Sequence, residues 1–137
     1  MANGYFSSSK HAYETLLKKG RKAFINREGL SAEEAIELIH ECGGKSFLAH
    51  PGIYDWEFSL SDLLEAGLNG IEVYYSQHND HDTNKWLELA KRNQLLVSVG
   101  SDFHGYQSRS PYPIGSVDYN EKQLEWVFAQ LEEEVRK

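Results

Sequence analysis

The sequence predicts an α/β fold in which parallel strands alternate with helices. Three short apolar runs, at residues 45–49, 71–75 and 95–99, are bounded by glycine or other turn residues, as expected for strands buried on both faces. Segments with helical periodicity precede and separate these runs. This alternation indicates parallel βαβ units, whose functional residues gather at the carboxyl ends of the strands.

The helices are expected from capping residues and periodic apolar positions. Ser31 and Glu34 form a capping box, and the helix that follows is expected to bury its apolar positions, Ala35, Ile36, Leu38 and Ile39. The other helices are expected over residues 7–19, from residue 59 or 61 to residue 68, and over residues 83–92 and 121–135.

The second apolar run contains a glutamate that must be explained. Strand alternation places Ile71, Val73 and Tyr75 on one face, and Glu72 and Tyr74 on the other. A carboxylate inside a barrel must be paired or lie near a metal. Glu72 is therefore either the structural partner of a buried cation or a supporting residue of a functional site.

Histidines lie at or near the ends of all three apolar runs. His50 follows the first and precedes Pro51, which excludes the α region at His50; His78 follows the second. Asp102 and His104 follow the third, and in an extended segment they point the same way. Such a pair can hold a divalent metal or act as an acid and a base. Alternatively, Asp102 caps a turn and His104 is a solvated loop histidine.

Two loops have open interpretations. Arg109 lies in the proline-containing loop of residues 106–115 and either clamps a phosphate or is solvated. The loop of residues 53–58 contains Tyr54, Trp56 and Phe58, which either pack against the end of the sheet or form a wall for a base or a sugar.

The length and charge of the chain limit its function. The 137 residues are expected to form a single domain, 1–137. A net charge of -7 argues against passive binding of nucleic acid, although bound metal ions would still permit a phosphate substrate. Cys42 is the only cysteine, which fits a reducing compartment, and no run approaches the roughly 20 apolar residues of a membrane span. We expect a soluble cytoplasmic chain.

Three motifs, in this order and spacing, resemble the PHP (polymerase and histidinol phosphatase) family. They are Ala49-His50-Pro51, Gly70-Ile71-Glu72-Val73-Tyr74 with His78, and Gly100-Ser101-Asp102-Phe103-His104-Gly105. The chain is most similar to the TrpH-like branch of metal-dependent phosphoesterases, and residues 12–24, 34–36 and 43–44 add to the similarity.

The resemblance implies a distorted (β/α)7 barrel with two or three divalent metals, Mn, Zn or Fe. His50, Asp102 and His104 match metal-ligand positions of the family. The nucleophile is then expected to be a metal-bound hydroxide, with no protein side chain as nucleophile. Residues assigned to the substrate phosphate or to a supporting shell are His78, Glu72 and Arg109.

One departure from the family is the absence of its His-x-His motif, because two residues separate His78 from His81. The chain therefore resembles the C-terminal half of a PHP domain, a single partial domain with an incomplete metal site. The N-terminal half is expected in the same gene or on another chain. Without it, the isolated chain is expected to be inactive.

The implied reaction is hydrolysis of a phosphoester in a nucleotide, another phosphorylated small molecule or a short RNA, as in an exoribonuclease. The alternative is a non-catalytic metal-binding or interaction module that pairs with a partner half. Exposed sheet edges would also favour a homodimer.

Overall fold

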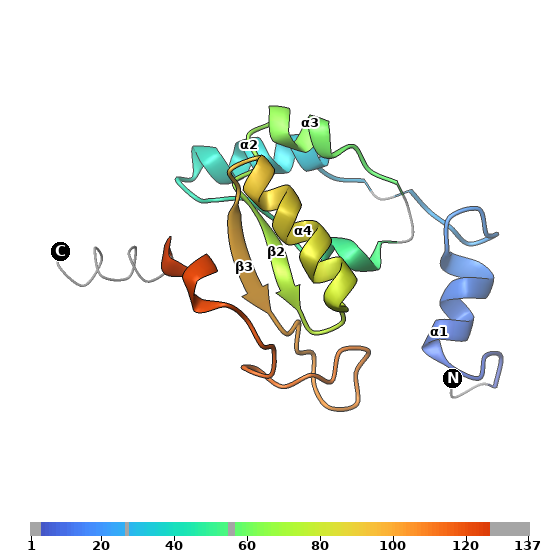
Figure 1. Ribbon diagram of the computed structural model, residues 1–137. Coiled ribbons are helices and arrows are strands. Elements are labelled where there is room, and N and C mark those ends of the chain that lie inside the picture. Colours follow the sequence, from blue (N-terminus) through green and yellow to red (C-terminus); the bar gives the residue numbers. More distant parts are fainter. Residues whose placement is uncertain (1–3, 27, 55–56, 127–137) are drawn as a thin grey trace. The chain divides into compact units, whose positions relative to one another are not determined.

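The computed structural model describes residues 4–26, 28–54 and 57–126 of the chain (Figure 1). The chain divides into two compact units, residues 1–30 and residues 31–137. Within the described parts, no helix is long and apolar enough to cross a membrane.

The first unit contains one helical segment, as predicted, with narrower bounds. Helix α1 (Ser9–Ala12) continues as a π-helical turn, η1 (Tyr13–Leu17), and Ser8 caps its start by accepting a hydrogen bond from the His11 amide. The Thr15 hydroxyl donates to the His11 carbonyl at 2.6 Å. This side chain thus competes with backbone amides for a carbonyl acceptor of the helix.

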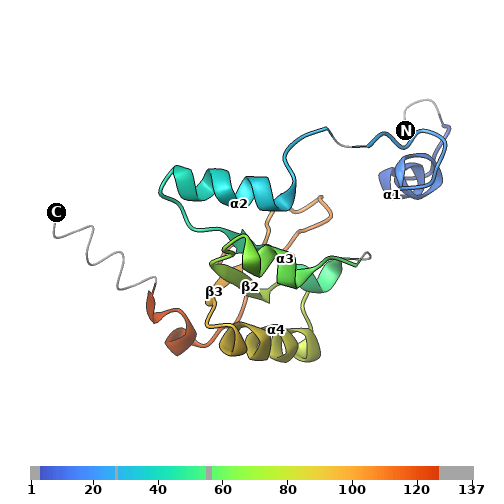
Figure 2. The same ribbon diagram turned by 90° about the horizontal axis from the view of Figure 1, so that it is seen from above.

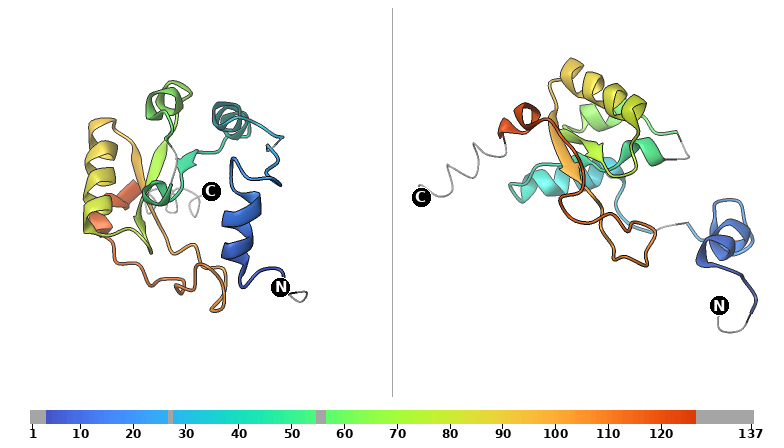
Figure 3. Two further views of the ribbon diagram at one scale, coloured as in Figure 1. Left: turned by 90° about the vertical axis from the view of Figure 1, so that its right-hand side faces the viewer. Right: turned by 60° about the horizontal axis from the view of Figure 1, so that its bottom comes forward.

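The second unit is built on a sheet of three parallel strands in the order β1-β2-β3, which confirms the predicted βαβ arrangement. The strands are β1 (Phe47–Leu48), β2 (Gly70–Tyr75) and β3 (Leu96–Gly100). Helices α2 (Ala32–Glu41) and α4 (Asp80–Arg92) lie on opposite sides of the sheet, as Figure 2 shows. Helix α3 (Leu60–Glu65) lies near the amino ends of the strands (Figure 3).

Capping residues begin the helices as expected. Ser31 and Glu34 form the predicted capping box of α2, and Ser59 caps α3. Helix α4 begins three residues earlier than predicted, because Asn79 and Asp82 form a second capping box there. The predicted C-terminal helix begins as a 3-10 turn, η3 (Glu121–Gln123), and its part from residue 127 onward lies outside the described residues.

The core surrounds strand β2, in which Ile71 and Val73 are completely buried. Ile36 of α2 also lies in this core. The prediction that Leu38 and Ile39 are buried is wrong: their exposed fractions are 48% and 38%. Only one narrow stripe of α2 faces the core, and these two residues lie outside it.

The predicted alternation along β2 is broken by a β-bulge. Glu72 pairs with Ser98, whereas Tyr74 pairs with Val99, so Val73 is an extra residue in the register. A bulge of this kind reverses the faces of the residues that follow it. Tyr75 consequently lies on the same side of the sheet as Glu72, not on the opposite side as predicted.

Burial of β2 leads to a test of the core. We expect Ile71→Val to lower the free energy of unfolding by about 0.5–1.5 kcal/mol, because the substitution removes a methylene from a completely buried site. The matched control is Ile39→Val on the exposed part of α2, which should change the value by less than about 0.5 kcal/mol. Urea denaturation followed by circular dichroism measures both, and equal effects would contradict this placement of the core.

Candidate metal centre

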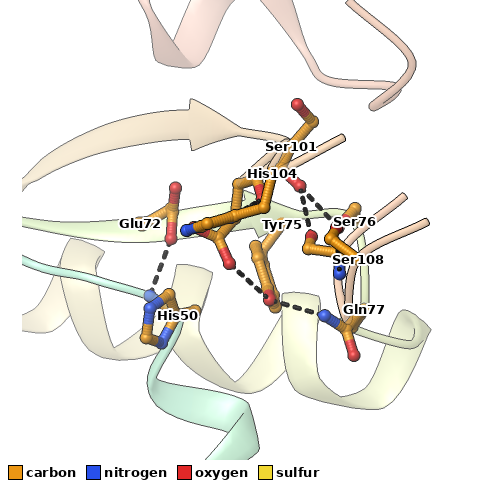
Figure 4. A network of polar contacts seen from close by, with 10 residues as sticks. His50, Glu72, Tyr75, Ser76, Gln77, Ser101, His104 and Ser108 are labelled. Atoms are coloured by element: carbon orange, nitrogen blue, oxygen red, sulfur yellow. Dashed lines mark hydrogen bonds and ion pairs between the residues drawn. The ribbon is translucent and has the colours of Figure 1, made fainter. Parts of the chain in front are cut away.

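Four side chains of types that can bind a metal lie near the carboxyl end of the sheet, and Figure 4 labels three of them, His50, Glu72 and His104. His50 follows β1, Glu72 lies in β2, and Asp102 and His104 follow β3. Since the three strands are parallel, their carboxyl ends lie at one edge. The structure thus brings together the three residues predicted as metal ligands and adds Glu72 to them, while their role as ligands stays a prediction.

The backbone of His50 adopts an uncommon conformation. Its φ of 32° and ψ of 55° lie in the left-handed region rather than in the extended region that residues before proline usually adopt. The His50 amide donates a hydrogen bond of 2.7 Å to Glu72 Oε2, and a short 3-10 turn, η2 (Pro51–Ile53), follows directly. The carboxylate and the turn together hold a conformation that costs free energy locally, as is common at functional sites.

The imidazole of His50 contains a buried atom without a partner. Its Nδ1 has no hydrogen bond within the described part of the chain. The ring lies between two tyrosines, with centroid distances of 5.7 Å to Tyr54 and 5.3 Å to Tyr75. A buried polar atom of this kind is costly unless a partner satisfies it, so this nitrogen is available to a ligand.

Glu72 lies in a partly buried position beside a second carboxylate. Burial raises the pKa of Glu72 above its ordinary value; the hydrogen bond from His50 and the charge on His50 lower it, and the charge of Asp102 raises it. Gly100 of β3 makes this position available, because a Cβ there would collide with Glu72 Oε1. A divalent cation would relieve the repulsion between the two carboxylates.

Asp102 and His104 are held together by the loop after β3. Asp102 is left-handed, with φ of 53°, and its Oδ1 lies 3.4 Å from His104 Nδ1. The same nitrogen donates to the Asp102 carbonyl at 2.6 Å, which leaves Nε2 to act as an acceptor or ligand. The backbone carbonyl of Ser110 accepts a hydrogen bond from the His104 amide. Ser110 is completely buried, so it anchors the loop.

Tyr75 is a site residue that the sequence analysis missed. Its hydroxyl lies 3.5 Å from Asp102 Oδ2 and accepts a hydrogen bond of 2.7 Å from Gln77 Nε2. Burial, followed by the charge of Asp102, raises the pKa of Tyr75, so the hydroxyl stays protonated and can donate to the carboxylate. No signal in the sequence marks the bulge that brings Tyr75 to this side.

The two remaining predicted residues lie outside this cluster. His78 Nδ1 donates to the Val73 carbonyl at 2.9 Å, and Nε2 accepts from the Gly52 amide at 3.1 Å, so the ring joins β2 to the turn after His50. Arg109 is exposed, with no side-chain partner among the described residues. Their contacts with a substrate stay predictions.

In the loop after β1, the aromatic side chains of Tyr54 and Phe58 contact neighbouring parts of the fold. Tyr54 donates to the Ala49 carbonyl at 2.8 Å, and Phe58 stacks on Trp86 of α4. Trp56 lies outside the described residues.

Across the described ranges, no three His, Cys, Asp or Glu side chains are already arranged around a common metal position. The donor set nevertheless suits a divalent cation, because it combines an unpartnered imidazole nitrogen with two neighbouring carboxylates. Small side-chain movements or further ligands would be needed to complete the coordination.

Comparisons with known proteins find relatives whose names describe the hydrolysis of phosphate esters or of RNA. No protein-family model matches the chain. Phosphoribosyl 1,2-cyclic phosphate 1,2-diphosphodiesterase of Eggerthella lenta is 38% identical over 100 residues, which are 73% of this chain and 38% of that protein. The 3',5'-nucleoside bisphosphate phosphatase of Chromobacterium violaceum is 33% identical, over 74% of this chain and 38% of that protein. The 5'-3' exoribonuclease Rnm of Salmonella typhimurium is 30% identical, over 74% of this chain and 36% of that protein. The chain spans less than two fifths of the length of these relatives.

Two solved structures share the fold. An amidohydrolase from Chromobacterium violaceum, with bound sulfate and no metal, has a TM-score of 0.70 and 29% identity, covering 86% of this chain and 42% of that one. A protein assigned as a metal-dependent phosphoesterase from Bifidobacterium adolescentis has a TM-score of 0.71 and 23% identity, covering 93% and 46%. With the three strand-end motifs and these phosphoesterase relatives, the chain belongs to the PHP family of phosphoesterases.

Proposed function

We propose that this chain carries part of the active site of a metal-dependent phosphoesterase that hydrolyses phosphate esters of nucleotides or of short RNA. The observation that carries the proposal is the buried, unpartnered Nδ1 of His50 at the strand edge that also holds Asp102 and His104. The names of the three relatives support it, since each relative acts on a phosphate ester of a ribose-containing compound or on RNA.

In this proposal, His50, Asp102 and His104 hold divalent ions, with Mn, Zn or Fe suiting mixed imidazole and carboxylate ligands. Bound there, the metals would activate water and stabilise the negative charge that develops on the phosphate. Glu72 adds negative charge beside these ligands and fixes the amide of His50.

Other residues of the chain orient this site. The Tyr75 hydroxyl lies within reach of one Asp102 oxygen, which limits how that carboxylate can turn. The Asp102 carbonyl selects the tautomer of His104 in which Nε2 is free. We assign Arg109 to the substrate phosphate, because it is exposed on the loop that follows these ligands. His78 acts indirectly, by holding Gly52 close to strand β2.

We further propose that the chain is a single partial PHP domain of a distorted (β/α)7 barrel. Strands β1 and β3 each pair on one side only within the described sheet, so each leaves an edge for a further strand. An N-terminal PHP half would cover such an edge and supply the His-x-His ligands. The absence of three preassembled ligands among the described residues favours the alternative, a non-catalytic module that pairs with such a half or with a second copy of itself.

The first test concerns Glu72. Its raised pKa means that the ionised form destabilises the folded chain, so stability present below the ordinary pKa, about 4.3, is lost as the pH rises through the folded-state value. We expect Glu72→Gln to unfold at higher urea concentration than the wild type at pH 7, with the difference vanishing near pH 4. Added Mn²⁺ should stabilise the wild type more than the variant.

Glu37→Gln on the exposed surface of α2 is the control for this test and should show neither effect. A variant of Glu72 that is less stable than the wild type at pH 7 would show that this carboxylate is a structural partner rather than a metal-site group.

The second test measures metal binding. We expect weak binding of Mn²⁺ or Zn²⁺ that falls as the pH is lowered, because protons compete with a metal for its ligands. His50→Ala and Asp102→Ala should each weaken it at least about tenfold, the loss typical of removing even a supporting contact. The exposed His81→Ala variant should titrate like the wild type in calorimetry. If all four titrations coincide, the metal centre is elsewhere.

The third test measures activity as release of phosphate from a 3',5'-nucleoside bisphosphate with Mn²⁺ present. The isolated chain should show none, because it lacks the His-x-His ligands. Fusion of the N-terminal half of a PHP domain should produce activity. Asp102→Ala or His104→Ala should then lower it at least about 100-fold, while His81→Ala retains it. Turnover by the isolated chain that survives Asp102→Ala would overturn both the partial-domain proposal and the site.

A further inference from the structure

The carbonyl oxygen of Ser101 accepts hydrogen bonds from two serine hydroxyls that lie far apart in the sequence. Ser76 Oγ donates to it at 3.0 Å and Ser110 Oγ donates at 3.2 Å. Figure 4 shows Ser76 and Ser101 in this network, near His104. The carbonyl belongs to the peptide group that joins Ser101 to Asp102, and the orientation of this group defines φ of Asp102. The two hydroxyls therefore act on the backbone of a proposed metal ligand.

The Ser76 hydroxyl extends the contact between β2 and β3 by one residue. The last register pair of these strands is Tyr75 with Gly100, and Ser76 and Ser101 are the residues that follow on each side. Beyond this point the backbone turns, because Asp102 is left-handed with φ of 53°. The hydroxyl thus ties the start of the turn to the end of the central strand.

Ser110 is bonded to the same segment at two points. Its hydroxyl donates to the Ser101 carbonyl, and its own carbonyl accepts a hydrogen bond of 3.1 Å from the His104 amide. Its amide donates to Ser108 Oγ at 3.0 Å, so each polar group of this completely buried residue has a partner. A buried residue bonded to both Ser101 and His104 limits how the segment between them can move.

The conformation held by these bonds is uncommon. A left-handed backbone brings Cβ close to a carbonyl oxygen, so Asp102 is expected to leave this conformation when the surrounding contacts are lost. Such a change would move the Asp102 carbonyl away from His104 Nδ1, which donates to it at 2.6 Å. His104 would then lose the contact that keeps its proton on Nδ1 and leaves Nε2 as an acceptor. Both side chains thus depend on the Ser101 peptide group.

We propose that Ser76 and Ser110 are positioning residues of the candidate metal centre, whose hydroxyls hold the Ser101 carbonyl and thereby the backbone of Asp102 and the tautomer of His104. The inference rests on the proposed function, in which Asp102 and His104 are metal ligands. Neither hydroxyl binds the metal or the substrate itself. A serine pair with a merely structural role would contribute to stability without changing the conformation of Asp102 or the tautomer of His104.

The first measurement is NMR of the whole chain without metal. The backbone chemical shifts and couplings of Asp102 report its left-handed conformation, and the ring nitrogen shifts of His104 report which nitrogen is protonated. Both signatures should be present in the wild type and lost in the double variant Ser76→Ala, Ser110→Ala, because both donors to the Ser101 carbonyl are then removed. Ser76→Thr should retain them, since threonine keeps the hydroxyl.

The second measurement is Mn²⁺ binding by calorimetry. The double variant should bind at least about tenfold more weakly than the wild type, the loss typical of removing outer partners of a metal ligand. Each single alanine variant should lose less, because one hydroxyl still holds the carbonyl. The control is Ser116→Ala, since this serine is exposed and its hydroxyl has no partner within the described ranges. It should match the wild type in both measurements.

If the double variant does not fold, Ser76→Ala compared with Ser76→Thr provides the same test: the alanine should weaken both signatures and the threonine should restore them. Wild-type signals of Asp102 and His104 in the alanine variants, or Mn²⁺ affinity equal to that of the wild type in the double variant, would overturn the positioning role alone. A wild-type chain that shows both signatures and binds no Mn²⁺ would instead overturn the metal-centre proposal.

Discussion

The hydrogen bond from the His50 amide to the Glu72 carboxylate, 2.7 Å long, is the interaction on which the candidate centre depends. It joins the segment after β1 to the central strand and holds His50 in the left-handed conformation. Without it, the first strand of only two residues, Phe47–Leu48, would do little to fix the histidine. The imidazole would then lose its place between Tyr54 and Tyr75.

The ionised carboxylate of Glu72 lowers the stability of the folded chain when nothing is bound beside it. Glu72 is partly buried, and Asp102 adds negative charge nearby, so the free chain holds like charges close together. Two carboxylates held close together in a partly buried position are typical of a binding site rather than of a structural ion pair. The close approach of Glu72 to Gly100 makes this arrangement sterically feasible.

The bulge at Val73 brings Tyr75 to the face of the sheet that carries Glu72. By changing the register between Glu72 and Tyr74, the bulge places the Tyr75 hydroxyl 3.5 Å from Asp102 Oδ2, while Tyr74 lies in the hydrophobic core. A regular strand would have placed Tyr75 on the face opposite Glu72.

The sequence by itself determined the features that depend on neighbouring residues. Apolar runs marked the three strands, the Ser31 and Glu34 pair marked the start of α2, and strand-end histidines marked the edge where the candidate centre lies. These signals are readable because strand period, capping and turn chemistry act over a few residues.

Only the tertiary structure decided the left-handed backbone of His50, the bulge at Val73, and the two serine hydroxyls that meet at the Ser101 carbonyl. It also decided that Leu38 is exposed while Ile36 of the same helix is buried. Each of these depends on groups distant in the sequence: a carboxylate 22 residues from His50, a register with β3, or a hydroxyl 25 residues before Ser101. Local periodicity contains no information about such partners, because packing and hydrogen bonding across the fold select them.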